Sequence, residues 1–465
     1  MPLRKPIFEH IRRVVDRMGV EAYVVGGYVR DYYLRRPSTD IDVVVVGSGV
    51  AVAEELGREL GAKVSVFRTY GTAMVRWRGT EVEFVGARRE SYTPESRNPR
   101  VEPGTLEDDQ RRRDFTINAM AWSLNGERFG ELVDPFDGMY DLEDCIIRTP
   151  CEPARTFSDD PLRMMRAVRF ASQLGFDIDD ETFEGICREA ERIKIVSKER
   201  IVVELNKIMA SPVPSIGFML MHTSGLLKYV LPELDRMAGV ERRGKHAHKD
   251  NFLHTLKVLD NLAKQSDDVW LRWAALLHDI GKPLTKAYDA RAGWTFHQHE
   301  AVGSKLVPQL FRRLKLPLGE QMRFVQKMVF LHMRPIVLSE DMVTDSAVRR
   351  LLFEAGDDVE KLMTLCEADI TSGNDSKVRL FLRNFELVRE KMRDLEERDR
   401  VRNFQPPITG DIIMREYNLP PSSVVGEIKE VIKNAILDGI IPNDYEAAYR
   451  LMEEEAERRG IVRQK

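Results

Sequence analysis

The chain has 465 residues, of which 43% are hydrophobic and 31% are charged, and this length predicts several packed modules. No apolar run approaches roughly 18 residues, and no apolar stretch of signal-peptide length opens the chain, so we expect a cytoplasmic protein without a membrane segment. Four cysteines without a Cys-x-x-Cys pair exclude a zinc knuckle and fit a reducing compartment. The net charge of -4 alone argues mildly against a nucleic-acid partner, although it averages over the modules.

The expected elements change character along the chain. Short β-branched runs at 23–25, 41–46 and 81–85 predict strands, whereas helical periodicity begins at Ser158 and continues almost to the end. This pattern predicts an α+β protein with a small mixed α/β head, residues 1–150, followed by a long all-α body. Proline- and glycine-rich joints divide the body into residues 151–215, 216–400 and 401–465. We expect the charged, proline-rich segment 88–109 to be a mobile loop.

Candidate chemistry in the head begins with two glycines and two aspartates. Gly26 and Gly27 stand between an expected strand and a helix, where backbone N–H groups can approach an anion, although a plain structural turn has the same appearance. Asp40 and Asp42 are two residues apart at the next strand, so their side chains share a face. Two like charges there favour a divalent cation, and oxygen ligands suit magnesium holding a substrate phosphate. Two solvated acids at a strand end are the alternative.

A third carboxylate is available on the strand at 81–85. We favour Glu83, and Glu81 on the same face is the alternative. Such a set is typical of two-metal sites that stabilise an attacking hydroxyl and a leaving pyrophosphate.

A series of motifs runs through the first half of the chain: GGYVRD, TDIDVVV, RRRDFTINAMA at 111–121, DPFDGMYDLEDCIIRT at 134–149, SDDPLRMMRAVRFASQLGF at 158–176 and SKERIVVELNKIM at 197–209. In order and content the series resembles the nucleotidyltransferases of the bacterial CCA-adding and poly(A) polymerase type. The resemblance implies a nucleotidyltransferase head in which Asp40 and Asp42 hold Mg²⁺ and act with Glu83 in catalysis. It also implies nucleotide binding by the residues at matching motif positions, which are Gly26, Gly27, Arg30, Asp31, Arg112, Arg113, Asp114 and Asn118.

Within that set the resemblance gives Arg113 and Asp114 contacts to the ribose, where the 2′-hydroxyl distinguishes a ribonucleotide. Arg112 and Asn118 match positions near the triphosphate. An exposed basic turn before a helix is the alternative for the arginine triplet at 111–113.

Base choice is expected at the start of the helical body. Ser158 is a suitable N-cap with Pro161 in the first turn, so a helix is predicted to begin here. Asp160 and Arg163 are three apart and offer an acceptor beside a forked donor, a pair that can mimic a Watson–Crick edge for cytosine or adenine. The matching pair does this in the family, whereas dipole compensation or an internal ion pair is the alternative.

Arg166 and Arg169 continue the same expected helix and could meet the triphosphate or the RNA backbone. They complete the predicted nucleotide-binding set. We therefore expect residues 151–215 to form a helical neck that selects the base and binds RNA.

The reaction implied by the resemblance is attack of an RNA 3′-hydroxyl on the α-phosphorus of CTP or ATP, with pyrophosphate leaving. Poly(A) polymerases of this type normally carry a GRRF-like signature after the carboxylate strand, and VFRTYGTAMVRW occupies that region here, which favours CCA addition to tRNA. Poly(A) addition, or addition of only CC or only A, remains the alternative. In the family, the loop Arg89–Gly104 influences this choice. A hydrolase whose head merely binds nucleotide or RNA is an alternative of another class.

Most of the nine histidines lie between His246 and His332, and His278-Asp279 follows an apolar run at the end of an expected buried helix. Any one of them is ordinarily a core or surface histidine. As a set they resemble the HD-type metal phosphohydrolases. The resemblance implies a metal site in residues 216–400. Two of its ligands, His299 and His332, are typical of two-metal members. The full set is His254, His278, Asp279, His299, His332 and Asp369.

Imidazole and carboxylate ligands suit manganese, iron, nickel or zinc better than magnesium alone. A water deprotonated between two ions could attack a phosphate ester, and Lys282 could brace that phosphate. We expect a live site rather than a degenerate scaffold, and a cyclic or terminal phosphate at an RNA 3′ end is the hypothesised substrate. The resemblance further implies a tRNA-binding helical tail, residues 401–465, with tRNA, CTP and ATP as partners. The sequence leaves the oligomeric state open.

Overall fold

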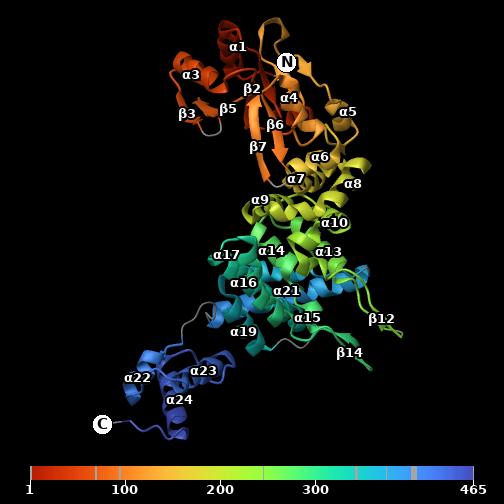
Figure 1. Cartoon of the computed structure of the whole chain (residues 1–465). Coiled ribbons are helices and arrows are strands. Elements are labelled where there is room, and N and C mark those ends of the chain that lie inside the picture. The colour runs from red at the N-terminus through yellow and green to blue at the C-terminus, as the bar shows by residue number, and fades with distance from the viewer. Residues whose placement is uncertain are drawn as a thin grey trace. The chain divides into compact units, whose positions relative to one another are not determined.

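The computed structural model describes residues 3–68, 71–93, 96–244, 246–340, 344–372, 374–399 and 406–463. The chain divides into two units, Met1–Arg236 and Met237–Lys465, each described here by itself. The first contains a mixed sheet with helices and the second is almost entirely helical (Figure 1). The predicted α+β class is therefore confirmed.

The head contains a seven-stranded sheet in the order β3-β4-β5-β2-β1-β8-β9. Neighbouring strands are antiparallel except β2 and β5, which run parallel. The three strands expected from the sequence are confirmed as β1, β2 and β5. The strand bounds are β1 (Ala22–Val25), β2 (Ile41–Val45), β3 (Lys63–Phe67), β4 (Thr72–Trp77), β5 (Thr80–Gly86), β8 (Ala121–Ser123) and β9 (Leu132–Val133).

Burial explains the central place of β1 and β2. Every residue of β1 is buried, and in β2 only Asp42 is exposed. Strands covered on both faces read as continuous apolar runs, as both of these do. Helix α3 (Gly49–Leu60) packs on the sheet so closely that a Cβ at Gly49 would lie 2.7 Å from the carbonyl carbon of Val85. The other helices beside these strands are α1 (Pro6–Met18) and α2 (Gly27–Tyr33).

The expected mobile loop at 88–109 is wrong. Strands β6 (Arg88–Thr93) and β7 (Ser96–Pro103) form an antiparallel hairpin, followed by helix α4 (Leu106–Arg111). Arg89 faces Glu102 across the hairpin with their charged atoms 2.9 Å apart. Both strands of a two-stranded ribbon are edges, so proline and charge are tolerated there and do not signal coil. Pro94 and Glu95 lie outside the described residues.

Helices make up the remainder of the first unit, and one predicted boundary is wrong. Ser158 lies inside a helix, α6 (Pro153–Asp159), and does not cap one. The next helix, α7 (Leu162–Phe170), starts after a break at Asp160, whose backbone is extended because Pro161 disfavours a helical residue before it. The other elements are α5 (Gly138–Glu143), β10 (Ile146–Ile147), β11 (Asp177–Ile178), α8 (Asp180–Glu189), α9 (Lys198–Met209), α10 (Pro214–Thr223), α11 (Leu227–Val230) and α12 (Pro232–Asp235).

The second unit packs long helices around an apolar centre that includes Trp273 and Phe311. Two short hairpins project from it, β12 (Arg242–Arg243) with β13 (His246–Ala247), and β14 (Ala287–Asp289) with β15 (Gly293–Thr295) (Figure 1). Its helices before the tail are α13 (Asn251–Ala263), α14 (Val269–Leu277), α15 (Lys282–Thr285), α16 (His299–Leu314), α17 (Glu320–Leu331), α18 (Met333–Glu340), α19 (Asp345–Ala355), α20 (Val359–Ala368) and α21 (Asp375–Asp399).

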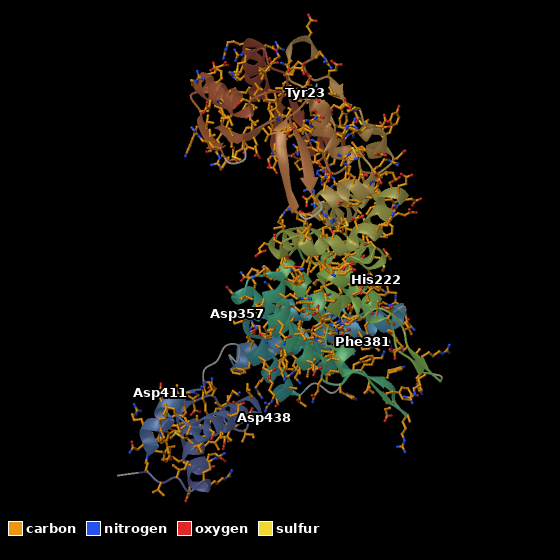
Figure 2. All side chains as sticks on the ribbon, viewed as in Figure 1. Tyr23, His222, Asp357, Phe381, Asp411 and Asp438 are labelled. Atoms are coloured by element: carbon orange, nitrogen blue, oxygen red, sulfur yellow. The ribbon has the colours of Figure 1, made fainter. Side chains whose placement is uncertain are left out.

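The tail consists of α22 (Gly410–Tyr417), α23 (Ser423–Leu437) and α24 (Tyr445–Arg458), which share a small core of their own. Asp438, labelled in Figure 2, lies at the end of α23. It accepts hydrogen bonds from Arg350 of α19 at 2.9 Å. No helix in the described part of the chain is long and apolar enough to cross a membrane.

Candidate active site and metal centre

The head carboxylates gather where β2 and β5 run side by side. The register pairs Asp42 with Glu83 directly, and Asp40 lies just before β2 begins. Glu81 instead forms a 2.7 Å ion pair with Arg76 on β4. The geometry thus brings Glu83 to Asp42 and gives Glu81 a different partner, in agreement with the preferred assignment.

The same carboxylates shift the pKa of Asp42. Burial raises the pKa of Asp42 above its usual range, the charge of Arg113 opposes this, and the carboxylates of Glu83 and Asp40 add to the rise. Clustered carboxylates of this kind repel one another unless a cation lies among them. Because their donors are all oxygen, they fit a hard divalent ion.

Gly26 lies against this carboxylate. Its φ of +74° is a left-handed conformation that favours glycine, and a Cβ there would stand 3.1 Å from Nη1 of Arg113 and 3.8 Å from Oδ2 of Asp42. Helix α2 begins at the next residue, Gly27. The absence of a side chain therefore keeps open the space between a guanidinium and a carboxylate, as the sequence predicts for a site where backbone approaches a ligand.

A residue that the sequence pattern did not indicate, Asp109, holds two of the three arginines at 111–113. The Asp109 side chain is fully buried, and its two oxygens accept from different arginines. Oδ1 accepts from Arg112 Nε at 3.0 Å, and Oδ2 accepts from Arg113 Nη2 at 3.0 Å and Nε at 3.2 Å. The spacing of three and four residues on one helical turn was the available signal.

Five predicted nucleotide-binding residues form one hydrogen-bonded chain. Arg30 donates to Asn118 Oδ1 at 2.7 Å and, through Nε and Nη2, to Asp31. Asn118 Nδ2 donates to Asp114 Oδ1 at 3.0 Å, and Arg166 Nε donates to Asp114 Oδ2 at 2.7 Å.

Asp114 stays ionised because of its partners in this hydrogen-bonded series. Burial alone would raise its pKa, but the Arg166 charge and the Asn118 hydrogen bond outweigh burial and lower the pKa to about 2. The carboxylate of Asp114, itself an expected ribose contact, is thus ionised and fixed in position.

The two residues predicted to read the base are not paired with each other. Asp160 Oδ2 accepts from Arg200 at 3.0 Å, and its Oδ1 accepts from the backbone N–H of Leu162. Arg163 donates to the carbonyl oxygens of Arg112, at 2.6 Å, and Thr156, at 3.3 Å. The internal ion pair considered as an alternative is therefore absent from this pair of described residues.

Arg112 and Arg163 do share a space. Both line a polar cavity of about 630 Å³ between the β6–β7 hairpin, α4 and α6. Arg169, by contrast, is only 6% exposed and donates to Glu204, with its guanidinium 3.8 Å from the centre of the Phe170 ring. Its charge is neutralised inside the protein, so the geometry gives it a packing role and does not bring it to this cavity.

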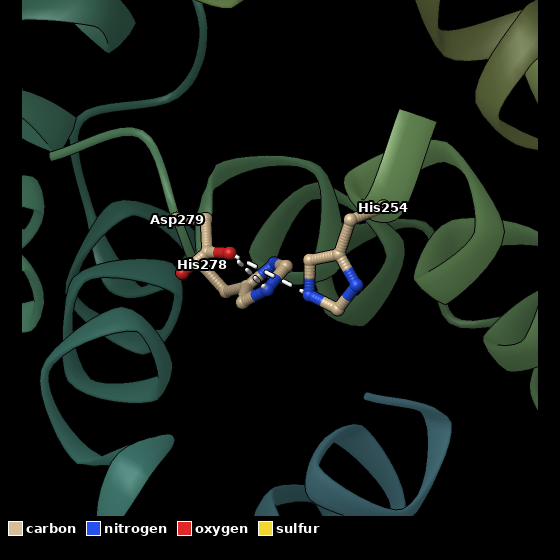
Figure 3. A group of neighbouring side chains, drawn as sticks. All are labelled: His254, His278 and Asp279. Atoms are coloured by element: carbon tan, nitrogen blue, oxygen red, sulfur yellow. Dashed lines mark ion pairs between the residues drawn. The ribbon is translucent and has the colours of Figure 1, made fainter. Parts of the chain in front are cut away.

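The predicted metal residues of the second unit come together from five helices and their ends. His254 Nε2 lies 2.9 Å from Asp369 Oδ1 and 3.6 Å from Asp279 Oδ2, and His278 Nε2 lies 3.2 Å from the same Asp279 oxygen (Figure 3). Lys282 Nζ donates to that oxygen at 2.6 Å. His254, His278 and Asp279 form one compact group that could hold a metal ion.

A second group uses the other oxygen of Asp279. His299 Nε2 lies 3.2 Å and His332 Nε2 3.9 Å from Asp279 Oδ1, and the two imidazole nitrogens are 3.3 Å apart. Asp279 therefore belongs to both groups and presents one oxygen to each. A carboxylate in this position can bridge two cations.

Hydrogen bonds behind the ligands turn the histidines toward the centre. The Nδ1 atoms of His278, His299 and His332 lie 2.7 to 2.9 Å from backbone carbonyl oxygens, which only accept. Each Nδ1 therefore carries a proton and Nε2 faces inward, the arrangement usual for metal-bound imidazole. Nε2 of His278 is buried and lacks a hydrogen-bond partner among the described residues, which is the expected state of an atom reserved for a metal.

The charge of the centre fits a cation. Burial would lower the pKa of His278, but Asp279 and Asp369 outweigh it and raise the pKa to about 9. Burial and the neighbouring His278 charge lower the pKa of His332 to about 4. The carboxylates of Asp279 and Asp369 thus favour positive charge at this centre, and the imidazole and carboxylate donors of its two groups fit divalent metals.

Comparisons with known proteins match both parts of the chain that carry these residues. Three family models match: the poly(A) polymerase head domain at residues 22–148, the probable RNA- and SrmB-binding site of polymerase A at 175–237, and the HD domain at 251–374. The chain is 34% identical over 356 residues to an A-adding tRNA nucleotidyltransferase of Deinococcus radiodurans, covering 74% of this chain and 78% of that protein. It is 36% identical over 313 residues to the multifunctional CCA protein of Ectopseudomonas mendocina, covering 64% and 71%.

A solved structure of the Bacillus stearothermophilus CCA-adding enzyme in complex with CTP has the same fold, with a TM-score of 0.66 and 24% identity over 98% of this chain and 100% of that one. The combined coverage and identity of the relatives settle the family. The chain belongs to the tRNA nucleotidyltransferase family with a poly(A) polymerase-type head and an HD domain, and is a nucleotidyl-transferring enzyme.

Proposed function

We propose that the protein adds C, C and A to the 3′ end of tRNA from CTP and ATP, with release of pyrophosphate, in the cytoplasm. The observation that carries the proposal is the pairing of Asp42 with Glu83 across parallel strands, next to Gly26 and Arg113. Relatives named for A addition and for CCA synthesis supply the substrate class.

Asp40, Asp42 and Glu83 would hold Mg²⁺, which when bound lowers the barrier for hydroxyl attack and neutralises the leaving pyrophosphate. The protein's own contribution is placement. Gly26 lets the triphosphate reach the backbone, and Arg113, fixed by Asp109, faces the same space.

The buried chain from Arg30 through Asn118 to Asp114 would hold the ribose edge in a fixed geometry. Because Asp114 stays ionised, it accepts from a 2′-hydroxyl and thus favours a ribonucleotide. Arg112 would approach the triphosphate, and Arg166 would keep Asp114 charged.

For base choice we propose that Asp160 accepts from the exocyclic amine of cytosine or adenine while Arg163 donates to the neighbouring ring atom. Arg200 holds the Asp160 carboxylate at 3.0 Å and leaves other lone pairs available. Asp160→Ala is expected to relax base choice more than it slows chemistry. Unchanged selectivity in single-nucleotide incorporation would remove the protein-template account.

The test of the reaction is product sequencing. tRNA lacking its last three nucleotides and tRNA ending in CC are incubated with CTP and ATP together. Addition of CCA to the first and A to the second supports the proposal, whereas extension of only the CC-ended tRNA identifies an A-adding enzyme. Asp40→Ala with Asp42→Ala should abolish incorporation, and retained incorporation would refute the head assignment.

The third carboxylate has a matched control two residues away on the same strand. Glu83→Gln is expected to reduce incorporation by roughly 10³-fold or more, as for loss of a metal ligand in a two-metal site. Glu81→Gln removes only the exposed ion pair with Arg76 and should leave the rate within about twofold. Equal losses in both variants would contradict the assignment.

A second candidate function is favoured by the double use of Asp279 in the HD centre. We propose hydrolysis of a phosphate ester at an RNA 3′ end, with Mn, Fe, Ni or Zn held by His254, His278, Asp279, His299, His332 and Asp369. Lys282 would brace the substrate phosphate once Asp279 binds metal. Incubation with 2′,3′-cyclic AMP and added manganese or nickel tests this, and no release of product would count against it.

A further inference from the structure

A series of aromatic rings in edge-to-face contact leads outward from the HD centre. Lys282, whose Nζ contacts Asp279, also lies 5.7 Å over the ring of Phe296. The Phe296 carbonyl oxygen accepts from the ligand His299 at 2.9 Å. Phe296 is therefore tied to the metal residues on both its side-chain and its backbone side.

The series continues into the two projecting hairpins. The His248 ring lies 5.9 Å from Phe296 and 5.5 Å from Trp294, edge to face in both cases. Trp294 in turn lies 5.2 Å from Tyr288, its cross-strand partner. We refer to Phe296, His248, Trp294 and Tyr288 as the aromatic ladder.

Two cations lie on the ladder, and one of them, Lys286, also forms a 2.6 Å ion pair with Glu241 that an RNA phosphate would have to replace. Lys286 Nζ lies 4.7 Å over Trp294, and the Arg243 guanidinium lies 4.5 Å over Tyr288. The two hairpins meet at Gly293, where a Cβ would stand 3.0 Å from the His246 ring, so this glycine permits close packing. The indole Nε1 of Trp294 has no hydrogen-bond partner among the described residues.

A hairpin built only as scaffold would be expected to cover aliphatic side chains, because isolated two-stranded ribbons are marginally stable. Here the packing consists of rings that are partly open to solvent, with basic groups on their faces. Interleaved aromatic and basic side chains are the usual means of binding single-stranded nucleic acid, since bases stack on rings and cations meet phosphates. Paired bases cannot offer their faces in this way, which excludes duplex as the ligand.

We propose that the aromatic ladder, with Arg243 and Lys286, binds the single-stranded 3′ end of an RNA and leads its terminal phosphate to Asp279 and Lys282. The inference rests on the proposed phosphohydrolase function and assigns its substrate class as an RNA strand instead of a free nucleotide. Bases stack on Trp294 and Tyr288 in place of the cations, which move to the phosphates.

The experiment compares two substrates in the full-length enzyme with added manganese or nickel: 2′,3′-cyclic AMP and a single-stranded oligoribonucleotide that ends in a 2′,3′-cyclic phosphate. Trp294→Ala should lower the ratio of kcat/KM for the oligonucleotide to that for the mononucleotide by roughly tenfold or more, since stacking on one ring carries an effect of this size. Arg243→Gln, which keeps a polar side chain, should lower the ratio several-fold and flatten its salt dependence. Arg291→Gln, in the turn of the second hairpin but outside the ladder, is the control and should leave the ratio unchanged.

Equal ratios in wild type, Trp294→Ala and Arg243→Gln would overturn the proposal, as would a parallel loss on both substrates, which indicates a scaffold role. If the wild type hydrolyses neither substrate, the proposed hydrolysis is refuted, and the ladder is then tested by RNA binding alone. Tryptophan fluorescence is then titrated with an oligoribonucleotide in wild type and Trp294→Phe. Quenching that disappears in the variant supports the ladder, and identical quenching in both overturns it.

Discussion

Asp109 offers the sharpest test of how the head prepares its arginines. Asp109→Asn preserves the shape of the side chain but replaces one of two buried acceptor oxygens with a donating amide nitrogen. One of Arg112 and Arg113 then keeps its acceptor, and the other faces a donor. Removing one member of a buried ion pair costs about 3–5 kcal/mol, and because half of the contacts survive we expect about 3 kcal/mol.

For a unit of this length that loss corresponds to a fall in Tm of roughly 6–12 °C in a thermal unfolding measurement. Asp108→Asn on the same helix is the matched control. Asp108 is partly exposed and closes a capping box with Thr105, so its loss should cost about 1 kcal/mol. The pair thus separates the buried arginine clamp from a helix cap one residue away.

Kinetics separate positioning from stability. If Asp109 fixes Arg113 at the ribose, Asp109→Asn should reduce the preference for ATP over 2′-deoxy-ATP by about tenfold, the scale of one charge-assisted hydrogen bond. A merely structural role would lower the active fraction and leave that preference unchanged. Wild-type preference together with a Tm equal to that of Asp108→Asn would refute the reasoning.

Three further outcomes are expected. Gly26→Ala should raise the KM for nucleotides by about tenfold or more and destabilise by about 1–2 kcal/mol, because its φ is left-handed and a Cβ meets Arg113, and a KM equal to that of the wild type would contradict the cradle. The folded-state pKa of Asp114 is about 2, below its ordinary 3.8, so the ionised carboxylate stabilises the fold by about 2 kcal/mol at neutral pH. This stabilisation is lost as the pH falls toward 2. In urea unfolding, the difference in stability between wild type and Asp114→Asn should therefore shrink below about pH 4. Asp279→Asn should abolish phosphohydrolase activity and reduce bound metal in elemental analysis, with nucleotide incorporation retained; loss of both activities would show that the sites are not separate.

Local patterns predicted the strands well because strand formation depends on spacing along the chain. The runs at Tyr23 and Ile41 are strands since central strands need continuous apolar side chains. The candidate HD ligands could be named because the set resembles the pattern of HD-type phosphohydrolases, and the structure brings them together. Their double grouping around Asp279 could not, since it depends on which carboxylate oxygen each helix end approaches.

The errors arose where tertiary context overrides local preference. Charge and proline at 88–103 indicated a loop, yet a two-stranded ribbon tolerates both. Ser158 has the chemistry of an N-cap, but Pro161 ends the helix before it and moves the next start to Leu162. Asp109 escaped notice because an acid near arginines is commonplace in sequence, and only its complete burial shows that it holds two of them.

The near-neutral charge of the chain follows from how its arginines are held. Arg112 and Arg113 lie against Asp109, Arg166 lies against Asp114, and Arg169 lies against Glu204, so each guanidinium has a carboxylate partner before any substrate arrives. Such pairing lowers the net positive field. It also fixes the guanidinium N–H donors, so that they need little rearrangement when a triphosphate binds. A net charge of -4 is therefore compatible with an anionic substrate, because the affinity of a preorganised site depends on the direction of its donors more than on the sum of charges.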